Sequence, residues 1–574
     1  MSNVADTIVE TLAASGVKRV YGIPGDSLNG FTDALRTSES VEWVHVRHEE
    51  AAAFAAAAEA ELTGDLAVCA GSCGPGNLHL INGLFDAQRS RVPVLAIAAH
   101  IPSSEIGTGY FQETHPQELF RECSVYVEQV STPEQMPRVL NIAIRAAIEK
   151  RGVAVIVISG DVALAKATHQ AVSRIEPSRS ETVPAHAQLE QAASLLNDSS
   201  KVTILAGAGV NGAHDEVVEL AGVLQAPIVH ALRGKEFIEY DNPYDVGMTG
   251  LLGFASGYRA MESCDTLLVL GSDFPYPQFY PDQAQIIQID IRGENLGKRA
   301  PITLGLRGGV RESIASLLPL LKAKTKGKHL AAALSHYSKT RQKLDDLATP
   351  RGKNQAIHPQ YLARLIDELA TEDAVFIPDV GSPVVWAARY LSMNGRRRLI
   401  GSFNHGSMAN ALSQGIGAQA SQPDRQIIAL AGDGGLTMLL GELITLTQNK
   451  LPVKVVVFNN SSLNFVELEM KAAGFVNYGT ELKNPDFAAV AEAIGLKGIR
   501  VEDSADLEGA LAEAFAHDGP ALIDVVTERQ ELSVPPAITA EQLKGFALYA
   551  LRTVMSGKGD ELVDLAKSNI RQIL

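Results

Sequence analysis

The fold is decided by two stretches of the chain, Ile427-Ile-Ala-Leu-Ala-Gly-Asp-Gly434 and Val453-Lys-Val-Val-Val-Phe-Asn-Asn460. Each is a continuous apolar run that ends in polar residues, which is typical of a parallel strand covered on both faces. The 24 residues between them (459 − 434 − 1 = 24) are enough for a crossover helix. The two strands should therefore deliver an Asp and an Asn pair to one edge of a sheet, where α/β proteins bind ligands.

These residue types suit a metal-bound diphosphate. Carboxylate and amide oxygens are the ligands that Mg²⁺ prefers, and the ion usually shares its shell with phosphate oxygens. The glycines around Asp433 let backbone N–H groups approach a diphosphate. The alternative is a tight glycine turn and an Asn-rich turn that bind nothing, because a lone Gly-Asp-Gly is common. The spacing and the two preceding strands favour the binding site.

Short apolar runs alternate with helical patterns along the whole 574-residue chain. Because this alternation is typical of parallel sheets flanked by helices, we predict an α/β fold with three doubly wound parallel-sheet domains. Further predicted strands lie at 67–70, 94–98, 153–158, 202–206, 266–270 and 286–289.

Two changes in composition indicate linkers, one at about 173–188 and a basic one at about 322–359. They suggest domains over 1–182, 183–335 and 336–530, followed by a tail over 531–574. The first and third domains look related. A glycine turn follows a strand at Gly71 and at Gly432, and a proline opens the next strand 22 residues later in one (93 − 71) and 20 later in the other (452 − 432).

Composition excludes several classes of protein. The net charge of −16 argues against nucleic-acid binding. Cys69 and Cys73 have a zinc-like spacing, but no second ligand pair follows, so the four cysteines are interpreted as reduced, buried thiols of a cytosolic protein. We find no signal-peptide pattern and no apolar run long enough to span a bilayer.

The middle block contains Gly207-Ala-Gly209-Val-Asn-Gly212, which matches the G-x-G-x-x-G pattern of nicotinamide-dinucleotide sites. Such sites carry an acidic residue at the end of the following strand. Here the predicted strand 227–231 is followed by Leu232-Arg233-Gly234, so the pattern does not favour NAD.

From Arg47 to its C-terminus, the chain resembles the thiamine-diphosphate-dependent pyruvate oxidase family, and within it the bacterial pyruvate:quinone oxidoreductases. The Gly-Asp-Gly and Asn-Asn motif is that of the thiamine-diphosphate enzymes in general. The longer stretches that carry the resemblance are 69–80, 111–116, 230–236 and 401–408. The three domains would then bind the thiamine pyrimidine, FAD and the diphosphate with Mg²⁺, in that order.

The resemblance implies a set of thiamine residues. Glu49 would hydrogen-bond the pyrimidine ring and assist loss of the C2 proton, and Met408 would support the bent cofactor. Asp433, Asn460 and the backbone carbonyl of Ser462 would bind Mg²⁺. The matching contact positions for thiamine diphosphate are Glu49, Gly406, Ser407, Met408, Asp433, Gly434, Gly435, Asn460, Ser461, Ser462, Leu463, Asn464, Phe465 and Val466. Asn464 stands where we expect a smaller residue such as glycine.

The resemblance also implies substrate and flavin residues. Phe111, Gln112, Phe465 and Glu469 would face the substrate. The alternatives are a first-turn helix carboxylate for Glu49, core packing for Met408 and Phe465, and an ordinary loop for each of the flavin positions that follow. The positions that match flavin contacts are Thr249, Gly250, Leu251, Leu252, Ser272, Asp273, Phe274, Pro275, Tyr276 and Asp290.

An amphipathic pattern at 562–574 follows a predicted break at Pro535-Pro536. It indicates either a helix docked on its own protein or, by resemblance, a segment that lies on the membrane where quinone takes the electrons. The resemblance further implies pyruvate as substrate, a homotetramer, and a location on the inner face of the cell membrane. An oxygen-dependent pyruvate oxidase, an acetolactate synthase and a non-catalytic flavin-binding protein are the alternative functions.

Overall fold

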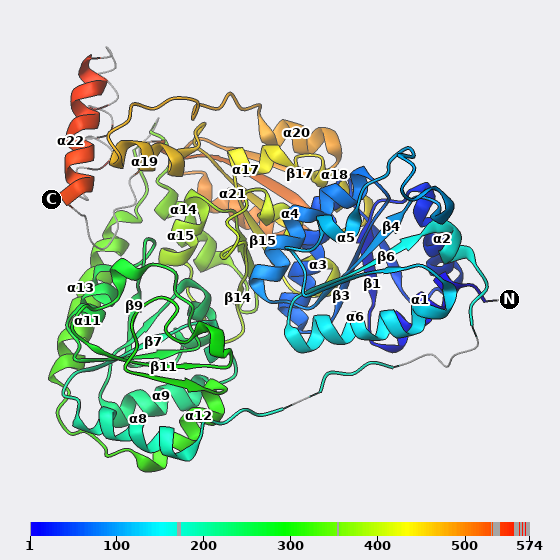
Figure 1. Ribbon diagram of the computed structural model, residues 1–574. Helices are drawn as coiled ribbons and strands as arrows, with labels where there is room; N and C mark the ends of the chain where they lie inside the picture. Colours follow the sequence, from blue (N-terminus) through cyan, green and yellow to red (C-terminus); the bar gives the residue numbers. More distant parts are fainter. Residues whose placement is uncertain are drawn as a thin grey trace.

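A computed structural model describes residues 2–168, 174–178, 180–352, 355–529 and 540–555, together with residues 531, 562, 565 and 569. It contains three α/β domains, each built on a six-stranded sheet whose strands pair in parallel, as the sequence predicts (Figure 1). The first domain lies at the right of Figure 1, the middle domain at the lower left and the third above it.

The first and third domains share one topology. The first sheet has the order β2-β1-β3-β4-β6-β5 and the third has the order β14-β13-β15-β16-β18-β17, so the same connections recur and the predicted relationship is confirmed. The strands of the first sheet are β1 (Arg19–Gly22), β2 (Glu42–His45), β3 (Ala67–Gly71), β4 (Val94–His100), β5 (Tyr126–Val130) and β6 (Val153–Ser159). Those of the third are β13 (Val375–Pro378), β14 (Arg398–Leu399), β15 (Ile427–Gly432), β16 (Lys454–Asn459), β17 (Lys497–Val501) and β18 (Ala521–Val526).

The middle sheet has a different order, β12-β11-β10-β7-β8-β9. Numbered along this domain, the order is 3-2-1-4-5-6 from the β9 edge, which is that of dinucleotide-binding domains and reverses direction between β7 and β10. Ligands bind such sheets at the carboxyl ends of the strands on either side of the reversal. The strands are β7 (Val202–Ala206), β8 (Ile228–His230), β9 (Asp245–Met248), β10 (Thr266–Leu270), β11 (Gln285–Asp290) and β12 (Leu304–Arg307).

The segment predicted as the second linker differs from the expectation. It contains the 20-residue helix α13 (Lys328–Leu347), on which Leu330 and Ala333 are buried. Most of the other side chains of α13 are at least partly exposed, so the sequence lacks the broad apolar stripe of a core helix. α13 packs on α11 (Ala255–Glu262) of the middle domain.

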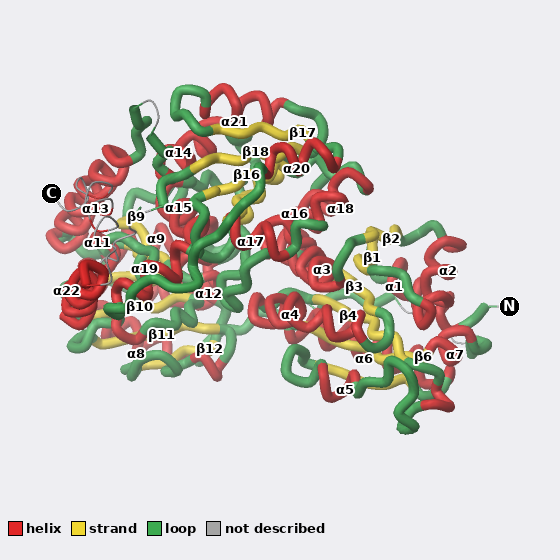
Figure 2. The backbone as a smooth tube through the Cα atoms, turned by 90° about the horizontal axis from the view of Figure 1, so that it is seen from above, coloured by secondary structure: helices red, strands yellow, loops and turns green. Residues whose placement is uncertain are grey.

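Two helices join the first domain to the third. α3 (Glu49–Thr63) lies against α16 (Asn410–Ser421), and Figure 2 shows the two side by side. The contact is close because Gly417 has no side chain: a Cβ added there would lie 1.9 Å from the carbonyl oxygen of Ala55. One buried apolar cluster runs through both domains as a result.

The other helices of the first domain are α1 (Val4–Ala14), α2 (Asn29–Ser38), α4 (Pro75–Ser90), α5 (Pro116–Leu119), α6 (Met136–Lys150) and α7 (Gly160–Leu164). The middle domain adds α8 (His186–Asp198), α9 (His214–Leu224), α10 (Lys235–Ile238) and α12 (Val310–Leu317). The third domain adds α14 (Pro359–Leu369), α15 (Ser382–Tyr390), α17 (Asp433–Met438), α18 (Glu442–Gln448), α19 (Asn464–Ala472), α20 (Phe487–Ile494) and α21 (Leu507–Ala516).

The last described helix, α22 (Ala540–Met555), packs on α19 (Figure 1). The predicted break at Pro535-Pro536 lies outside the described residues, as does the amphipathic pattern at 562–574 apart from residues 562, 565 and 569. Within the described residues, no helix is both long and apolar enough to cross a membrane.

Candidate active site

The Gly-Asp-Gly and Asn-Asn motifs lie at the carboxyl ends of the neighbouring strands β15 and β16. Asp433 is buried, and its carboxylate accepts hydrogen bonds from the backbone N–H of Gly434 (2.8 Å) and Ser461 (2.7 Å) and from Asn484 Nδ2 (2.8 Å). Burial raises the pKa of Asp433, while these donors act in the opposite direction. The carboxylate is thus oriented by three donors from three segments.

The neighbouring residues complete a set of oxygen ligands. Asn460 Oδ1 accepts from the backbone N–H of Ser462 at 3.0 Å, which fixes the turn after β16. Gly435 has no room for a side chain, because a Cβ there would lie 2.1 Å from Asp379 Oδ2, so the backbone of the turn packs directly on Asp379. Carboxylate and amide oxygens on two adjacent strand ends, beside side-chain-free backbone, fit a hard divalent cation with a diphosphate.

The loop predicted to support the thiamine reaches the same place. Gly406 and Ala409 both have positive φ angles (80° and 66°), so the chain turns sharply around Met408. The Met408 methyl carbon lies 3.3 Å from the position of a Cβ on Gly434. Ser407 accepts a hydrogen bond from Asn82 Nδ2 of the first domain (2.9 Å). The structure therefore places the 406–408 loop next to the Gly-Asp-Gly turn.

Glu49 opens α3 and is 6% exposed. Its carboxylate is paired with His79 Nδ1 at 2.9 Å, and His79 stacks on the His48 ring, with centroids 4.3 Å apart. Glu50, by contrast, is linked to the third domain of its own chain, because Asn82 Nδ2 donates to Glu50 (2.7 Å) as well as to Ser407. Within one chain, the contacts described for Glu49 are with the first domain.

Phe111 and Gln112 occupy a loop after β4. Phe111 is 78% exposed, and Gln112 has a φ of 61°, which is uncommon for a residue with a side chain. The next residue, Glu113, accepts from the backbone N–H of Gly107 (2.5 Å), Gly109 (2.6 Å) and Tyr110 (3.1 Å). The pKa of Glu113 is lowered, with the Gly107 bond as the largest cause. The loop thus presents Phe111 to solvent on an ordered turn.

The predicted flavin residues gather at the reversal point of the middle sheet and beside it. Ser272 follows β10 and is buried, and Asp290 ends β11, where it accepts from the Arg292 N–H (2.9 Å) and Asn295 Nδ2 (3.2 Å). The buried Thr249 hydroxyl has no hydrogen-bond partner among the described residues, which is rare in an interior and marks a place for a ligand's polar group. This edge fits a dinucleotide such as FAD.

Other predicted flavin residues lie in the loops that flank this edge of the sheet. Phe274 and Tyr276 meet edge to face at 5.4 Å. Burial acts to raise the pKa of Asp273, but Arg299 (2.7 Å) and Lys298 (3.2 Å) bring it below its ordinary value. Gly250 has a φ of 94°. The remaining predicted positions, Leu251, Leu252 and Pro275, lie in the same two loops.

The third domain brings its predicted substrate residues to this flavin edge. Glu469 on α19 lies near enough to Tyr276 for its charge to contribute, after burial, to the raised pKa of Tyr276. Phe465 and Leu252 both pack against the core of the third domain. α19 is therefore the element that links the thiamine motif to the flavin loops.

Asn464, at the position where we expect a smaller residue, is buried and has two partners. It accepts from the Ser382 hydroxyl (3.1 Å) and donates to the Arg529 carbonyl (2.6 Å). Its side chain thus fixes the first turn of α19, next to Phe465.

Sequence reasoning missed three residues at the site. Asn484 donates to both Asp433 and Asn459 from a loop with no motif. Asp379 is buried and accepts from the Gly432 N–H (3.3 Å), and burial raises its pKa to about 7. His79 pairs with Glu49, and its place one helical turn after Gly76 could have suggested that it lies at the same edge of the sheet.

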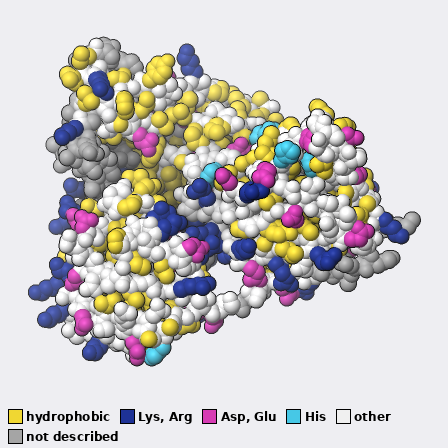
Figure 3. All heavy atoms as spheres, in the orientation of Figure 1, with side chains coloured by type: hydrophobic (Ala, Val, Ile, Leu, Met, Phe, Trp, Pro, Cys, Tyr) yellow, Lys and Arg dark blue, Asp and Glu magenta, His cyan; other side chains and the backbone are white. Residues whose placement is uncertain are grey.

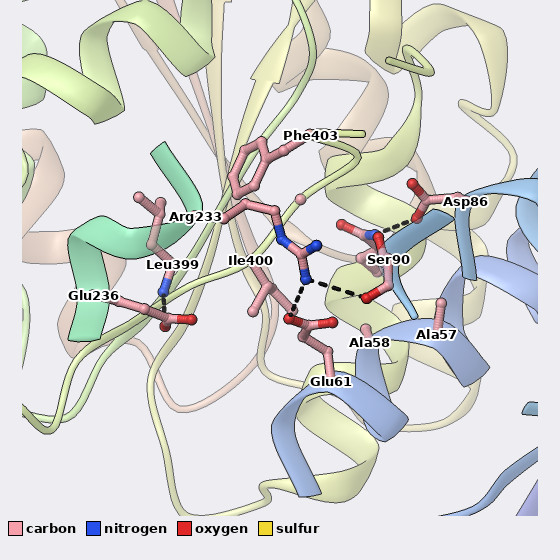
Figure 4. A pocket seen from close by; sticks show the side chains of 12 residues that line it. Ala57, Ala58, Glu61, Asp86, Ser90, Arg233, Glu236, Leu399, Ile400 and Phe403 are labelled. Atoms are coloured by element: carbon pink, nitrogen blue, oxygen red, sulfur yellow. Dashed lines mark hydrogen bonds and ion pairs between the residues drawn. The ribbon is translucent and has the colours of Figure 1, made fainter. Parts of the chain in front are cut away.

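A separate small cavity lies where the three domains meet (Figure 4). Arg233 of the middle domain bonds Glu61 and the Ser90 carbonyl of the first domain, both at 3.2 Å. Glu236 accepts from the Leu399 N–H of the third domain at 2.9 Å. The predicted site residues do not line this cavity, so we interpret it as part of the interface between the three domains.

Comparison with known proteins agrees with this architecture. Three profiles of the thiamine pyrophosphate enzymes match the chain: the N-terminal TPP binding domain at residues 2–119, the central domain at 189–317 and the C-terminal TPP binding domain at 379–525. The chain is 38% identical to a putative thiamine pyrophosphate-containing protein, YdaP, of Bacillus subtilis, over 98% of both chains.

Two relatives with named activities are similarly distant. A pyruvate oxidase of Lactiplantibacillus plantarum is 30% identical over 90% of this chain and 87% of its own. The large subunit of acetolactate synthase isozyme 1 of Escherichia coli is 30% identical over 94% of this chain and 97% of its own. The chain therefore belongs to the thiamine-pyrophosphate-dependent enzymes. Within that class, it is a decarboxylating enzyme of the pyruvate oxidase and acetolactate synthase type.

Proposed function

We propose that this enzyme oxidatively decarboxylates pyruvate to acetate and CO₂ and passes the electrons through FAD to a membrane quinone. The observation that carries the proposal is the position of α19, which begins at Asn464 beside the thiamine motif and carries Glu469, whose charge acts on Tyr276 of the flavin loop. An enzyme that only joins two pyruvates needs no electron path between these sites. Phe465, an aromatic residue on this helix, suits a place between the two cofactors.

In this proposal, thiamine diphosphate supplies the electron sink for decarboxylation and FAD accepts the two electrons. The residues of the chain bind and orient these groups. Asp433, Asn460 and Ser462 would hold Mg²⁺, Met408 would support the thiamine, and Gln112 would bind the substrate. Glu469 would face it from the third domain.

Glu49 would act on the cofactor bound to a partner copy. Its contacts in one chain are with the first domain, while the 406–408 loop of the same chain contacts Glu50 through Asn82. Exposed apolar side chains near both motifs, Leu78 (45%) and Met438 (56%), suit burial against another subunit. Histidines gather on this face of the first domain (Figure 3). We propose a homotetramer in which pairs of chains complete the thiamine sites.

The C-terminal region supports the quinone as acceptor. On α22, Leu551 (58%) and Met555 (79%) are exposed on one side, while Tyr549 is buried. Arg552 donates to the Gly474 carbonyl at 2.7 Å, which ties α22 to the end of α19. A helix that touches the catalytic helix and exposes apolar side chains suits reversible attachment to lipid. We propose that the enzyme works as a peripheral protein on the inner face of the cell membrane.

Product analysis tests the proposal. Purified enzyme with pyruvate, thiamine diphosphate, Mg²⁺ and a quinone in lipid vesicles should yield acetate and reduced quinone. Truncation after residue 550 should remove the stimulation by lipid but leave turnover with a soluble dye. Acetolactate as the main product, or acetyl phosphate with hydrogen peroxide, would replace the proposal with the acetolactate synthase or the oxygen-dependent oxidase.

A further inference from the structure

Cys73 occupies the turn between β3 and α4, at the carboxyl edge of the first sheet. It is 5% exposed, and its thiol donates to the side-chain oxygen of Gln112 at 3.3 Å. Its own backbone N–H donates to the Ser27 hydroxyl at 3.0 Å, and Ser27 also bonds the Ser72 hydroxyl at 2.9 Å. Ser27 therefore holds the backbone of the turn, and the thiol points to the loop that carries Gln112.

The same turn separates two residues of the proposed active site. On one side, a Cβ added to Gly74 would lie 2.9 Å from the Cβ of Gln112. On the other side, a Cβ added to Gly76 would lie 3.0 Å from the carboxylate of Glu49. The glycines thus let Gln112 and Glu49 approach the two sides of one turn.

Gln112 needs such support. Its φ of 61° is unfavourable for a side-chain-bearing residue, so the loop must be held by its surroundings. Glu113 orders the loop's backbone through three N–H groups, but it does not set the direction of the Gln112 amide. Among the residues that the structure describes, the Cys73 thiol is the one that bonds the amide itself.

We propose that Cys73 is a positioning residue: its thiol orients the Gln112 amide toward the substrate, and the 72–76 turn sets the spacing of Gln112 from Glu49. The proposal rests on the proposed function, in which Gln112 faces pyruvate. A thiol suits the task because it is small enough for the turn and offers a single weak donor.

A double-mutant cycle tests the proposal with kcat/KM for pyruvate and a soluble dye. Cys73→Ala should lower kcat/KM about fivefold, the loss expected for one weak hydrogen bond, and Cys73→Ser should restore it to within about twofold. In a Gln112→Ala background, Cys73→Ala should change nothing further. Exchange of the thiamine C2 proton should stay unchanged, because Glu49 lies beside Gly76, on the other side of the turn from Gln112. An equal loss from Cys73→Ala in both backgrounds would overturn the proposal.

A second readout does not depend on the reaction. Tyr110 and Phe111 are exposed, so chymotrypsin cleavage in this loop, followed by fragment mass, reports how firmly the loop is held. Cys73→Ala should speed this cleavage at least threefold. The matched control is Cys264→Ala, which removes a buried thiol that bonds the Met261 carbonyl in the middle domain and should leave the cleavage unchanged. Equal cleavage of the two variants would overturn the positioning role, whereas an absence of pyruvate turnover in the wild type would overturn only the proposed function.

Discussion

Replacing Glu49 by glutamine should nearly abolish activation of the thiamine while leaving the fold intact. The glutamine keeps the shape of a side chain that is 6% exposed, and its amide can still pair with His79, whose side chain is 44% exposed. We therefore expect the free energy of unfolding to change by less than about 1 kcal/mol. The catalytic loss should be about 10²–10⁴-fold, the usual contribution of a positioned acid or base, or about 3–5 kcal/mol in barrier height.

The assay is exchange of the C2 proton of bound thiamine diphosphate for deuterium, quenched with acid and measured by NMR. Glu50→Gln is the matched control, because Glu50 is the next residue and is linked by Asn82 to the 406–408 loop of its own chain. It should change the exchange rate by less than about fivefold, since its amide can still bond Asn82. Wild-type exchange in Glu49→Gln, or a larger loss in Glu50→Gln, would refute the assignment of the proton-transfer role to Glu49.

Four other substitutions probe individual contacts. Asp433→Ala removes the acceptor of three hydrogen bonds and a proposed metal ligand, so the Mg²⁺ concentration that half-saturates thiamine binding, measured by calorimetry, should rise about 100-fold; an unchanged value would remove Asp433 from the metal site. Thr249→Val replaces a buried hydroxyl that has no partner among the described residues and should weaken FAD retention about tenfold on dilution, followed by flavin fluorescence; equal retention would argue against a flavin contact. Gly417→Ala places a Cβ 1.9 Å from the Ala55 carbonyl oxygen, so it should lower the free energy of unfolding by about 1–3 kcal/mol or more and the Tm by several degrees; an unaltered Tm would contradict the α3–α16 packing. Burial raises the pKa of Asp86 to about 7, so the folded protein keeps a proton that the unfolded chain releases near pH 4, and stability should fall as pH rises from about 4 to 7; Asp86→Asn should make this fall smaller without removing it, because burial also raises the pKa of Asp379 to about 7, and an unchanged fall would contradict the assignment.

Much of the fold could be predicted from sequence, because strands buried on both faces leave unbroken apolar runs. β15 and β16 are examples, and the polar residues at their ends correctly predict the edge that carries Asp433 and Asn460. The repeat of glycine and proline spacing correctly indicates that the first and third domains are related. The prediction of a linker over helix α13 is wrong because Leu330 and Ala333 are the only buried residues of this fully described helix, so the helix lacks a broad apolar stripe, and a run of lysines at 322–328 leads into it.

The remaining details depend on tertiary contacts that no local pattern encodes. Asn484 reaches Asp433 from 51 residues further along the chain. The two partners of Asn464 are more remote still: Ser382 precedes it by 82 residues and Arg529 follows it by 65, so a residue that looks out of place in the motif is in fact held on both sides. The thiol contact of Cys73 is likewise invisible in sequence, where the residue suggests only a buried cysteine.

Coupling of pyruvate decarboxylation to the flavin is tested most directly by the anaerobic absorbance of the flavin. Enzyme loaded with thiamine diphosphate, Mg²⁺ and FAD should lose its flavin absorbance when pyruvate is added without oxygen or quinone, and Glu49→Gln should not. Flavin that stays oxidised while pyruvate is consumed would contradict this coupling, because it would make the flavin structural and favour acetolactate synthesis or simple decarboxylation.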